Sequence, residues 1–417
     1  MTAARGRPVV VLCPHFAPDT APTGVVMTRI VHELVQRGRE VHVVTSLPWY
    51  RDHRIEPGWS GGLMRTERMP WGAVHRVHPF PGGDRTNLPR RALGFLAFSL
   101  LALVAGMRAA GWWRRCDAVI AMSPPLTLGL TGWLVARAHR AQLVFNVQDI
   151  FPDAAERSGA VTGRRVLTLA RWLERLTYRR SSAVTVLSSD LADNVAAKLP
   201  AALRHRVRVI PNFVDTLAIT PGERMTPYRR ELGLGEGPVA MYAGNVGFSQ
   251  PFDLVVEAAR RLPEVMFVIN GDGAAAADLD AAIAGLPNVR RSGYQPVERL
   301  AEVLASADLH LVLLKSGLGA VSVPSKTYSV LAASRPVVAA IDPDTEVPRL
   351  LARAQAGLVV APDDVDGFVA AIGTLVADEP RRRAMGQRGR ALVVAEASPG
   401  AVGAAYDDLI AQVARRS

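Results

Sequence analysis

The sequence predicts an α/β protein built from two doubly wound parallel-sheet domains in tandem. Short apolar runs typical of buried strands alternate with longer runs typical of helices, a pattern that favours parallel sheets covered by helices. The chain has 417 residues, which exceeds what one hydrophobic core usually supports. Its composition, 49% hydrophobic and 21% charged, is globular and supplies enough apolar side chains for two cores.

The first series of elements begins with the run VVVLC. We expect a strand here and not a signal peptide, because the apolar run is brief and ends at a proline. A helix through MTRIVHELVQRG and a strand at EVHVVTS should follow, with later strands at DAVIAM, QLVFNV, AVTVLS and VRVIP. The prolines and polar residues of 212–237 then separate this half from a second series. Its strands are expected at PVAMYAG, MFVINGDG, NVRRSGY, LHLVLL, RPVVAA and GLVVAP.

The longest uncharged stretch, ALGFLAFSLLALVAGM, lies between Arg91 and Arg108. As a helix it would reach roughly 24 Å, short of the ~30 Å hydrocarbon core, so it should not span a bilayer. Arginines and the run WWRR border it, which suits a membrane interface. Residues 91–113 could form a buried helix, a membrane-binding surface, or a helix with one face packed and the other on lipid.

The net charge suggests the class of partner, and the cysteine content suggests the cellular compartment. The formal net charge of +11, from 49 basic and 38 acidic residues, suggests a nucleotide, a nucleic acid or an anionic membrane as partner. Much of this excess is arginine, which also matches the compositional bias of a GC-rich genome. Cys13 and Cys116 form no CxxC and no metal spacing, so we expect reduced thiols in a cytoplasmic protein.

No metal site is expected. The histidines show no ligand spacing. Asp342-Pro343-Asp344 spells a DxD, but it follows a predicted strand in a loop, where this sequence is ordinary turn chemistry.

Glycine turns follow three strands of the second half in succession. They are AGNVGFSQ with Gly244 and Gly247, GDG with Gly271 and Gly273, and SGY ending at Tyr294. Ligands of doubly wound sheets bind at the carboxyl ends of strands, so three such turns on one edge predict a ligand cleft, although each alone is more often a plain chain reversal. No GxxxxGK[ST] occurs, and AGNVGF lacks the third glycine of the dinucleotide fingerprint, which disfavours ATP hydrolysis and NAD redox chemistry.

The segment SVPSKTYSVLAASRPVVA, residues 322–339, places Lys326 at the start of a nearly uncharged helix. A cation is unfavourable at the positive end of a helix dipole, so an anion is expected beside it. The alternative is a solvated surface lysine. Arg335, in the turn before the next strand, could contact the same anion or simply lie on the surface.

These motifs, taken with CPHFAPDTAPTG, GREVHVVT, DIFPDAA, VTVLSSDL and VIPNFVD, resemble glycosyltransferase family 4 over nearly the whole chain. They are most similar to its bacterial polysaccharide branch. The resemblance implies the GT-B fold, in which two Rossmann-like domains face each other across a cleft. It implies an acceptor-binding domain at 1–212, completed by a C-terminal crossing helix at about 396–417, and a nucleotide-sugar-binding domain at 213–395.

Chemistry independently supports an anion at Lys326, because a departing nucleoside diphosphate develops negative charge. We expect its ammonium to stabilise that charge, together with backbone amides at the helix start and in the AGNVGFSQ loop. The resemblance places the nucleobase against the strand end at 292–294 and the loop of Gly24 beside the phosphates. The expected donor-binding residues are Gly24, Gly244, Asn245, Gly247, Gly271, Gly273, Tyr294, Pro324, Ser325, Lys326 and Glu346.

The chain departs from the family pattern in two places. Many members carry a glutamate pair near this helix, where this chain has Val321 and Ser329. Glu346 could replace the lost ribose or sugar contact, or it could only stabilise a helix dipole. Many members also carry a basic pair in the loop that here reads GNVGFSQ, so Lys326 would bear more of the phosphate charge.

On the acceptor side, Asp149 follows the strand QLVFNV and could orient or deprotonate an acceptor hydroxyl. His15, after the first strand, is a second candidate, and Asp153 suits a helix cap better. The resemblance implies retention of anomeric configuration. No carboxylate pair suited to double displacement is evident, so we expect front-face attack driven by the leaving group.

The sequence thus predicts a cytoplasmic, metal-independent hexosyl- or N-acetylhexosaminyltransferase. It would use a nucleotide sugar, with UDP the expected nucleotide, and no other cofactor. The expected acceptor is a polyprenyl-diphosphate-linked sugar or a glycolipid of cell-surface polysaccharide assembly, at the inner face of the membrane and with no nucleic-acid partner. The alternatives are a transferase for a soluble natural product or small glycoside, and a non-catalytic nucleotide- or polyanion-binding protein of the same fold.

Overall fold

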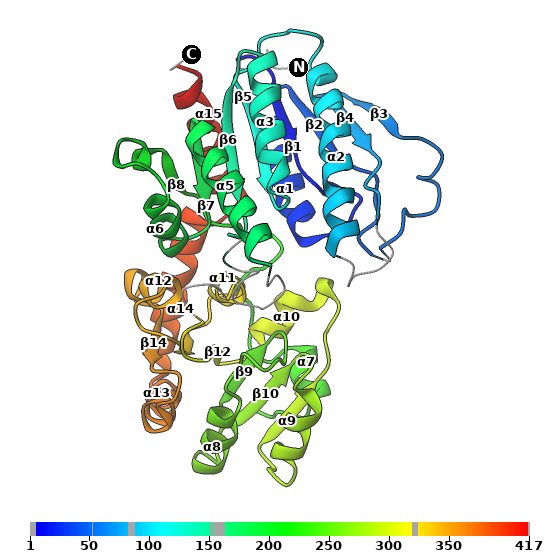
Figure 1. Ribbon diagram of the computed structural model, residues 1–417. Helices are drawn as coiled ribbons and strands as arrows, with labels where there is room; N and C mark the ends of the chain where they lie inside the picture. Colours follow the sequence, from blue (N-terminus) through cyan, green and yellow to red (C-terminus); the bar gives the residue numbers. More distant parts are fainter. Residues whose placement is uncertain are drawn as a thin grey trace. The chain divides into compact units, whose positions relative to one another are not determined.

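The structure, a computed structural model, describes residues 6–51, 53–81, 88–150, 153, 163–318 and 324–415, with the side chains of α2 described from Leu93 onward. The chain divides into two compact units (Figure 1). Unit 1 holds Met1–Asn212 with Val402–Ser417, and unit 2 holds Phe213–Ala401.

The described part of unit 1 forms an eight-stranded sheet in the order β3-β4-β2-β1-β5-β6-β7-β8. All neighbouring strands are parallel except β3, which runs antiparallel to β4. The strands are β1 (Val9–Leu12), β2 (Val41–Ser46), β3 (Met64–Met69), β4 (Gly72–Val77), β5 (Ala118–Ser123), β6 (Gln142–Val147), β7 (Ala183–Val186) and β8 (Val207–Val209). The helices are α1 (Pro22–Gln36), α2 (Leu88–Ala109), α3 (Thr127–Ala138), α5 (Arg164–Arg180), α6 (Ser189–Ala197) and the 3₁₀ turn η1 (Ala201–Arg206).

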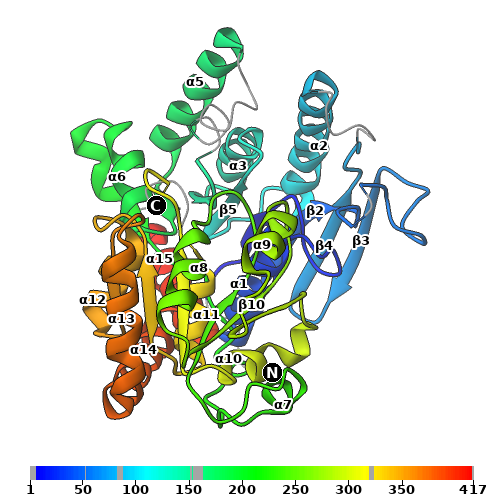
Figure 2. The same cartoon turned by 90° about the horizontal axis from the view of Figure 1, so that it is seen from below.

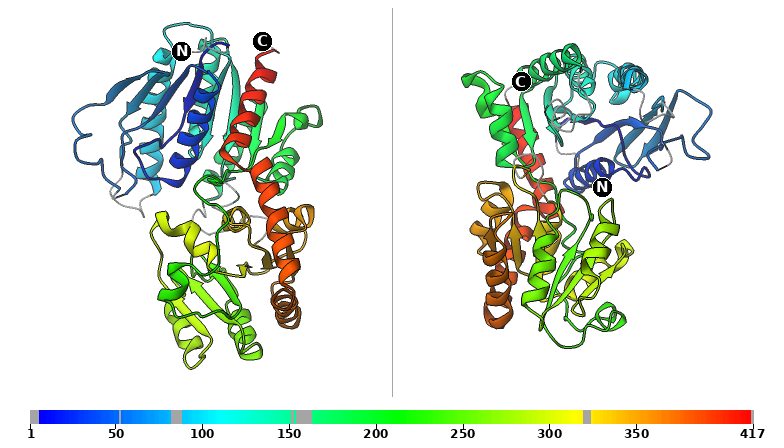
Figure 3. Two further views of the ribbon diagram at one scale, coloured as in Figure 1. Left: turned by 180° about the vertical axis from the view of Figure 1, so that it is seen from behind. Right: turned by 60° about the horizontal axis from the view of Figure 1, so that its bottom comes forward.

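Helices cover both faces of this sheet. Figure 2 shows α2, α3 and α5 together on one face, and the left view of Figure 3 shows α1 and the C-terminal helix α15 (Pro399–Ala414) on the other. Every strand expected in this half is present. The hairpin of β3 and β4 was not expected, because β3 reads MRTERM and lies largely exposed, so it lacks the apolar run that marks a buried strand.

Unit 2 is a six-stranded sheet, parallel throughout, in the order β11-β10-β9-β12-β13-β14. All six strands match the apolar runs expected for this half: β9 (Val239–Ala243), β10 (Met266–Asn270), β11 (Val289–Ser292), β12 (Leu309–Leu313), β13 (Val337–Ala340) and β14 (Gly357–Val360). The helices are α7 (Pro227–Glu231), α8 (Asp253–Arg261), α9 (Ala276–Ile283), η2 (Val297–Arg299), α10 (Leu300–Ala305), α11 (Lys326–Ala332), α12 (Glu346–Ala354), α13 (Val365–Ala377) and α14 (Glu379–Glu396).

Alternate strand residues of unit 2 feed separate cores on the two faces of the sheet. Leu311 and Leu313 pack with Phe368 of α13, whereas Val312 packs with Leu331 of α11. This is the side-chain alternation of a strand buried on both faces. Because all six strands are parallel, the loops that follow them meet at one edge, where the candidate site lies.

The uncharged stretch before Trp112 forms α2, a helix of 22 residues and so longer than the stretch between the two arginines. One face packs into the core, with Phe98 only 3% exposed and Ala102 and Ala105 buried beside it. The opposite face is exposed. Within the described ranges, no helix combines the length and apolar character that a membrane span requires.

Candidate functional site

The three glycine turns of unit 2 stack on one another at the carboxyl edge of its sheet. The Gly244 N–H donates to the Asn270 carbonyl and the Gly271 N–H to the Ser292 carbonyl, both at 2.8 Å. Gly244, Gly271 and Gly273 all have positive φ, and a Cβ at Gly271 would collide with the Gly244 carbonyl oxygen. Glycine is needed here because backbone packs directly on backbone.

Lys326 lies against the end of β9. Its Nζ donates to the Tyr242 hydroxyl at 2.5 Å and lies 3.8 Å from the centroid of that ring. The Tyr242 hydroxyl in turn donates to the Asn245 carbonyl at 2.6 Å. A Cβ at Gly244 would lie 2.5 Å from Nζ, so the glycine leaves the space that the lysine occupies. The expected proximity of Gly244 and Lys326 is therefore present.

The electrostatic state of Lys326 is unusual for a lysine. Burial lowers its pKa from 10.5 to about 8. Among the described residues, no Asp or Glu lies within 4.0 Å of its ammonium. The interpretation of Lys326 as a solvated surface lysine is wrong. A desolvated cation without a counter-charge is what an anion-binding site presents before its ligand arrives.

The backbone amides expected at this site are only partly open. The Val246 N–H donates to the Asp272 carbonyl at 2.9 Å and the Gly247 N–H to Gln250 Oε1 at 3.0 Å. The expectation that Gly247 offers its amide to a diphosphate does not hold in this structure, because Gln250 takes that donor. The amides of Asn245, Ser325 and Lys326 have no acceptor among the described residues, and the Pro324 carbonyl closes the turn by accepting from Thr327.

Lys315 is a residue that our sequence analysis missed. It lies two residues after β12, its side chain is exposed, and its N–H donates to the Ser249 carbonyl at 2.9 Å. This places it beside the loop that lacks the family's basic pair. The signal that could have found it is a lysine in the loop that follows a fully buried strand, within VLLKSG.

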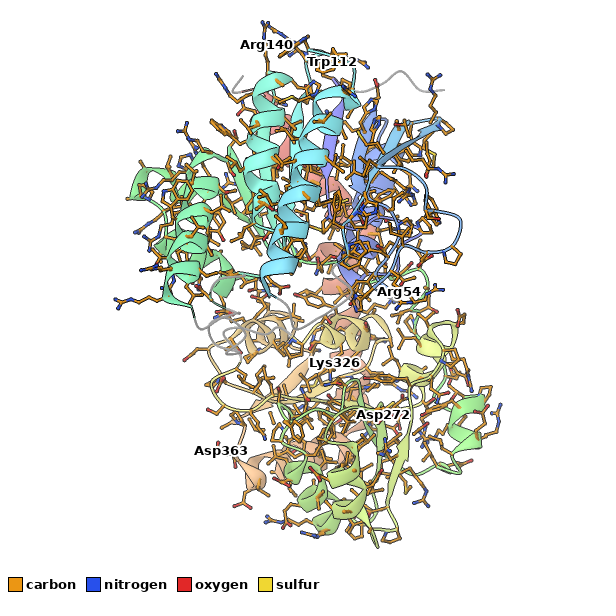
Figure 4. All side chains as sticks on the ribbon, turned by 45° about the vertical axis from the view of Figure 1, so that its right-hand side comes forward. Arg54, Trp112, Arg140, Asp272, Lys326 and Asp363 are labelled. Atoms are coloured by element: carbon orange, nitrogen blue, oxygen red, sulfur yellow. The ribbon has the colours of Figure 1, made fainter. Side chains whose placement is uncertain are left out.

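Three acidic or aromatic residues complete this edge. Tyr294, 61% exposed, donates its hydroxyl to the Asp272 carbonyl at 3.0 Å, so its ring lies over the glycine rim, where Figure 4 labels Asp272 and Lys326. Glu346 is buried at the first residue of α12. Burial, and secondarily the charge of Glu346, raise the pKa of Tyr328 to about 12.

The DPD sequence fixes a neighbouring loop in place through the side chain of Asp342. Asp342 accepts from the Ser316 hydroxyl at 3.2 Å and from the Gly317 N–H at 2.9 Å, so its carboxylate anchors the loop after β12. In the part of the chain that the structure describes, no three His, Cys, Asp or Glu side chains gather as metal ligands. Metal independence stays a prediction.

Arg335 does not belong to the site. It precedes β13, at the opposite edge of the sheet from the glycine turns, and its Nη2 donates to the carbonyls of Gly222 and Ala305, both at 2.7 Å. The idea that it contacts the same anion as Lys326 is therefore wrong.

In unit 1, His15 follows β1 and is oriented by a buried carboxylate. Its Nδ1 lies 2.7 Å from Asp19 Oδ2, and the other oxygen of Asp19 is buried without a hydrogen-bond partner. The imidazole stacks on Trp49 at 5.6 Å between ring centroids and meets Tyr50 edge-on at 5.4 Å. With Nδ1 held by Asp19, Nε2 is the nitrogen left to act on a ligand.

Gly24 supports this arrangement. A Cβ at Gly24 would lie 2.8 Å from His15 Cβ, so the glycine lets α1 approach the loop that carries the histidine. The close approach expected at Gly24 is thus made by the His15 loop, and its contact with phosphates stays a prediction.

Asp149 and Asp153 take different positions. Asp149 follows β6 with an exposed side chain, and partial loss of hydration raises its pKa. No described residue hydrogen-bonds its carboxylate. Asp153 accepts from Asn194 at 3.0 Å and Lys198 at 2.9 Å, which ties it to α6, whereas the residues that would form its helix cap lie outside the described ranges. His15, already oriented by Asp19, is better placed as a base than Asp149.

Comparisons with known proteins agree with this architecture. Residues 23–212 match the Glycosyl transferase 4-like domain, and residues 237–378 match the Glycosyl transferases group 1 family. The putative colanic acid biosynthesis glycosyl transferase WcaI of Escherichia coli K12 is 26% identical over 369 residues, which cover 86% of this chain and 89% of that protein.

Solved structures show the same fold. Sucrose-phosphate synthase from Thermosynechococcus elongatus superposes with a TM-score of 0.70 at 17% identity, covering 99% of this chain and 100% of that one. HepE from Anabaena, solved with UDP, gives 0.69 at 14% identity, covering 97% and 100%. The two matched domains and the two parallel-sheet units together show that the chain belongs to glycosyltransferase family 4 and has the GT-B fold.

Proposed function

We propose that the protein transfers a hexose or N-acetylhexosamine from a UDP-sugar to a lipid-linked sugar acceptor in cell-surface polysaccharide assembly, with retention of anomeric configuration and without a metal. The assignment of the donor rests on Lys326, at the carboxyl edge of the sheet of unit 2. Its ammonium is largely buried, and no carboxylate of the described residues pairs with it. Related structures of HepE were solved with UDP and with UDP-glucose, which favours the same donor class here.

Lys326 would act on the leaving group. The charge that develops on the diphosphate as the glycosidic bond breaks would be stabilised by an ammonium that is largely buried. Tyr242 fixes the position of this ammonium, so little reorganisation is needed when the donor binds. Lys315 would supply a second, exposed cation from the loop after β12.

The acceptor hydroxyl would give up its proton to His15. Asp19 holds Nδ1 and stabilises the imidazolium that forms after proton transfer. Attack from the face of the departing diphosphate retains configuration without a covalent enzyme intermediate. The anomeric configuration of the product, determined by NMR coupling constants, tests this step.

The lipid-linked acceptor and a position at the inner membrane face are supported by α2. Its outward side is apolar over several turns, with Leu93 66% and Leu100 57% exposed. Relatives include the lipopolysaccharide core biosynthesis glycosyltransferase LpsE of Rhizobium meliloti, 29% identical over 258 residues, which cover 59% of this chain and 69% of that protein. A soluble acceptor is the second candidate, because alpha-D-kanosaminyltransferase of Streptomyces kanamyceticus is 29% identical over 247 residues, 56% of this chain and 61% of that protein.

The experiment that tests the donor assignment combines thermal melting with kinetics. A panel of nucleotide sugars is screened for stabilisation, and the donor found is used for turnover by Lys326→Ala and Lys326→Arg. Loss of a charge-assisted contact worth on the order of 3 kcal/mol in the transition state should slow Lys326→Ala roughly a hundredfold or more. Lys326→Arg should recover only part of the rate, because the guanidinium differs in shape and reach.

Two controls accompany this test. Turnover should survive EDTA, and a loss restored by added manganese would contradict the metal-independent mechanism. Wild-type turnover in a well-folded Lys326→Ala protein would show that the lysine is not part of the donor site. Absence of stabilisation by any nucleotide sugar would favour a non-catalytic role.

A further inference from the structure

Unit 1 contains a hollow of about 550 Å³ at the carboxyl edge of its sheet. One wall comes from His53 and Arg54, which follow β2, and another from His78 and Phe80, which follow β4. The third wall is the first described turn of α2, including Leu93 and Ala97. The hollow thus lies at the end of the unit where His15 follows β1, and Figure 4 shows Arg54 at the end opposite to Trp112.

The apolar wall of this hollow continues onto the surface of α2. Leu93 both lines the hollow and is exposed, and Leu96, Leu100 and Val104 follow it at helical spacing on the same outward side. Residues three and four apart share one helix face, so these four side chains form an uninterrupted apolar stripe. We call it the α2 stripe. The α2 stripe is therefore an apolar surface along which a long hydrocarbon chain could lie, ending at the hollow.

The polar side of the hollow is basic. Arg54 is exposed, and none of the described lining residues is an Asp or Glu. His78 Nδ1 accepts the Phe80 N–H at 3.1 Å, so the neutral imidazole carries its hydrogen on Nε2 and can donate. Burial lowers the pKa of His78 and favours that neutral form. One guanidinium and the imidazoles of His53 and His78 give this side donors for a phosphate group.

Two residues that line the hollow have unusual backbone conformations. His53 has φ of 53° and Phe80 φ of 50°, both in the left-handed region, which is uncommon for residues other than glycine and an outlier for a bulky side chain such as that of Phe80. A Cβ at Gly94 would lie 2.8 Å from the Phe80 carbonyl oxygen, so α2 approaches this wall only because glycine stands there. Strain of this kind persists where the surrounding structure enforces it, and it is concentrated at binding sites.

Aromatic rings connect the hollow to His15. The His53 ring meets Trp49 at 5.9 Å and Tyr50 at 6.0 Å between centroids, and both of these rings also contact His15. Such rings suit the apolar face of a sugar. An apolar stripe, a basic hollow, an aromatic pair and an oriented imidazole therefore follow one another along one edge of unit 1.

We propose that this hollow binds the phosphate-bearing head of a lipid-linked sugar, with its hydrocarbon chain along the α2 stripe and its sugar on Trp49 and Tyr50 toward His15. This inference rests on the proposed function, whose acceptor it locates. A soluble glycoside would use the aromatic pair but would leave both the stripe and the basic side unused.

The test uses farnesyl diphosphate as probe and isothermal titration calorimetry on the full chain in the presence of excess UDP. We expect specific binding, with pyrophosphate alone and farnesol alone each at least roughly tenfold weaker, because each makes only half of the contacts. Arg54→Glu and Ala97→Trp should each weaken farnesyl diphosphate binding roughly tenfold or more, the first by charge and the second by filling the hollow. The matched controls are Arg51→Glu, an exposed arginine outside the lining, and Ala138→Trp at the end of α3, which should bind as wild type.

Four outcomes would overturn the inference. They are wild-type binding by Arg54→Glu and Ala97→Trp, equal binding of pyrophosphate, equal binding of farnesol, or binding lost in Lys326→Ala, which would place the probe in the donor site. The proposed function fails separately. If UDP-sugars neither stabilise the protein nor turn over while farnesyl diphosphate still binds with this specificity, the lipid site stands and the transferase assignment falls.

Discussion

The ammonium of Lys326 couples donor binding to stability. Its pKa is lowered from 10.5 to about 8 by burial, so between these values the folded chain binds fewer protons than the unfolded chain. Stability therefore rises with pH across this window. Below pH 8 the charged, desolvated lysine destabilises the fold by up to about 3 kcal/mol, at 1.36 kcal/mol for each pKa unit. A bound diphosphate would offset this cost.

We predict that Lys326→Met raises the free energy of unfolding at pH 7 by up to about 3 kcal/mol while turnover is lost. Methionine fills similar volume without a charge, so the gain should shrink as the pH rises from 8 to 10.5 and vanish above that range, where the wild-type lysine is neutral in both states. Urea unfolding at pH 7 and above pH 10.5 measures it. Lys315→Met is the matched control, because that exposed lysine carries no comparable cost. Equal stability of wild type and Lys326→Met at pH 7 would contradict the burial argument.

The pair of His15 and Asp19 permits a second residue-level prediction. His15→Ala should lower turnover by roughly 10² to 10⁴, the range for a general base, while UDP still stabilises the protein. Asp19→Asn should lower it less, because the imidazole remains but loses the carboxylate that orients it and stabilises its charge. His205→Ala, an exposed histidine on η1, is the control. If Asp149→Ala abolishes turnover and His15→Ala does not, Asp149 is the base.

At the level of elements, the buried strands could be predicted because each is a short apolar run, whereas β3 could not, because its side chains are mostly exposed. The faces of α2 could not be predicted either. A helix apolar all round carries no pattern that distinguishes core from surface, so the sequence left all three alternatives for residues 91–113 open. The structure buries Phe98 in the core and exposes Leu96 and Leu100.

The candidate site was predictable in its residue types more than in its contacts. The three glycine turns stand out because they follow consecutive strands, and Lys326 stands out because a cation is unfavourable at the start of a helix. Their partners lie far away in the sequence: Gly271 packs on Gly244, and Lys326 contacts Tyr242. Single-chain patterns do not encode such pairings. The Gln250 side chain on the Gly247 amide is a local contact, three residues away, and it was missed because the sequence does not fix the orientation of a side chain within a loop.

The structure gives α2 one packed face and one exposed apolar face, which is the alternative that makes a membrane prediction specific. On the same side of unit 1, α5 also exposes large apolar side chains, with Leu169 64% and Trp172 58% exposed, among exposed arginines (Figure 2). Apolar side chains bordered by arginine suit an anionic membrane surface. We predict that Leu96→Asp with Leu100→Asp, and separately Leu169→Asp with Trp172→Asp, lower binding to anionic vesicles at least roughly tenfold.

Co-sedimentation with vesicles measures this prediction, and melting curves confirm that each variant is folded. The control is Leu217→Asp with Val297→Asp, which charges two exposed apolar residues of unit 2. Neutral phosphatidylcholine vesicles should bind the wild type weakly, because the arginines then have no anionic partner. Unchanged binding of both α2 and α5 variants to anionic vesicles would show that this side of unit 1 does not contact lipid.

At the scale of the whole molecule, the last residues of the chain complete its first unit. Tyr406 of α15 is buried, and its hydroxyl accepts from Asn146 Nδ2 of β6 at 2.6 Å. Arg39, before β2, donates to Asp117 at 2.7 Å and to Asp407 at 2.6 Å. The sheet of unit 1 therefore depends on side chains that are synthesised last, whereas unit 2 has cores of its own.

This dependence predicts that the two units respond separately to core substitutions. Tyr406→Ala should lower the free energy of unfolding of unit 1 by about 3–5 kcal/mol, because it removes a large buried ring and one of the hydrogen bonds of the buried Asn146. Tyr406→Phe, which removes only the hydroxyl, should cost about 1 kcal/mol.

Differential scanning calorimetry with and without UDP measures both effects, since UDP should raise only the melting temperature of the unit that binds it. In unit 2, Leu375→Ala is the counterpart, and it should lower the UDP-dependent transition alone. If Tyr406→Ala instead abolishes the UDP-stabilised transition while Leu375→Ala leaves it intact, the donor is held by unit 1, and the assignment of Lys326 to the diphosphate falls with it.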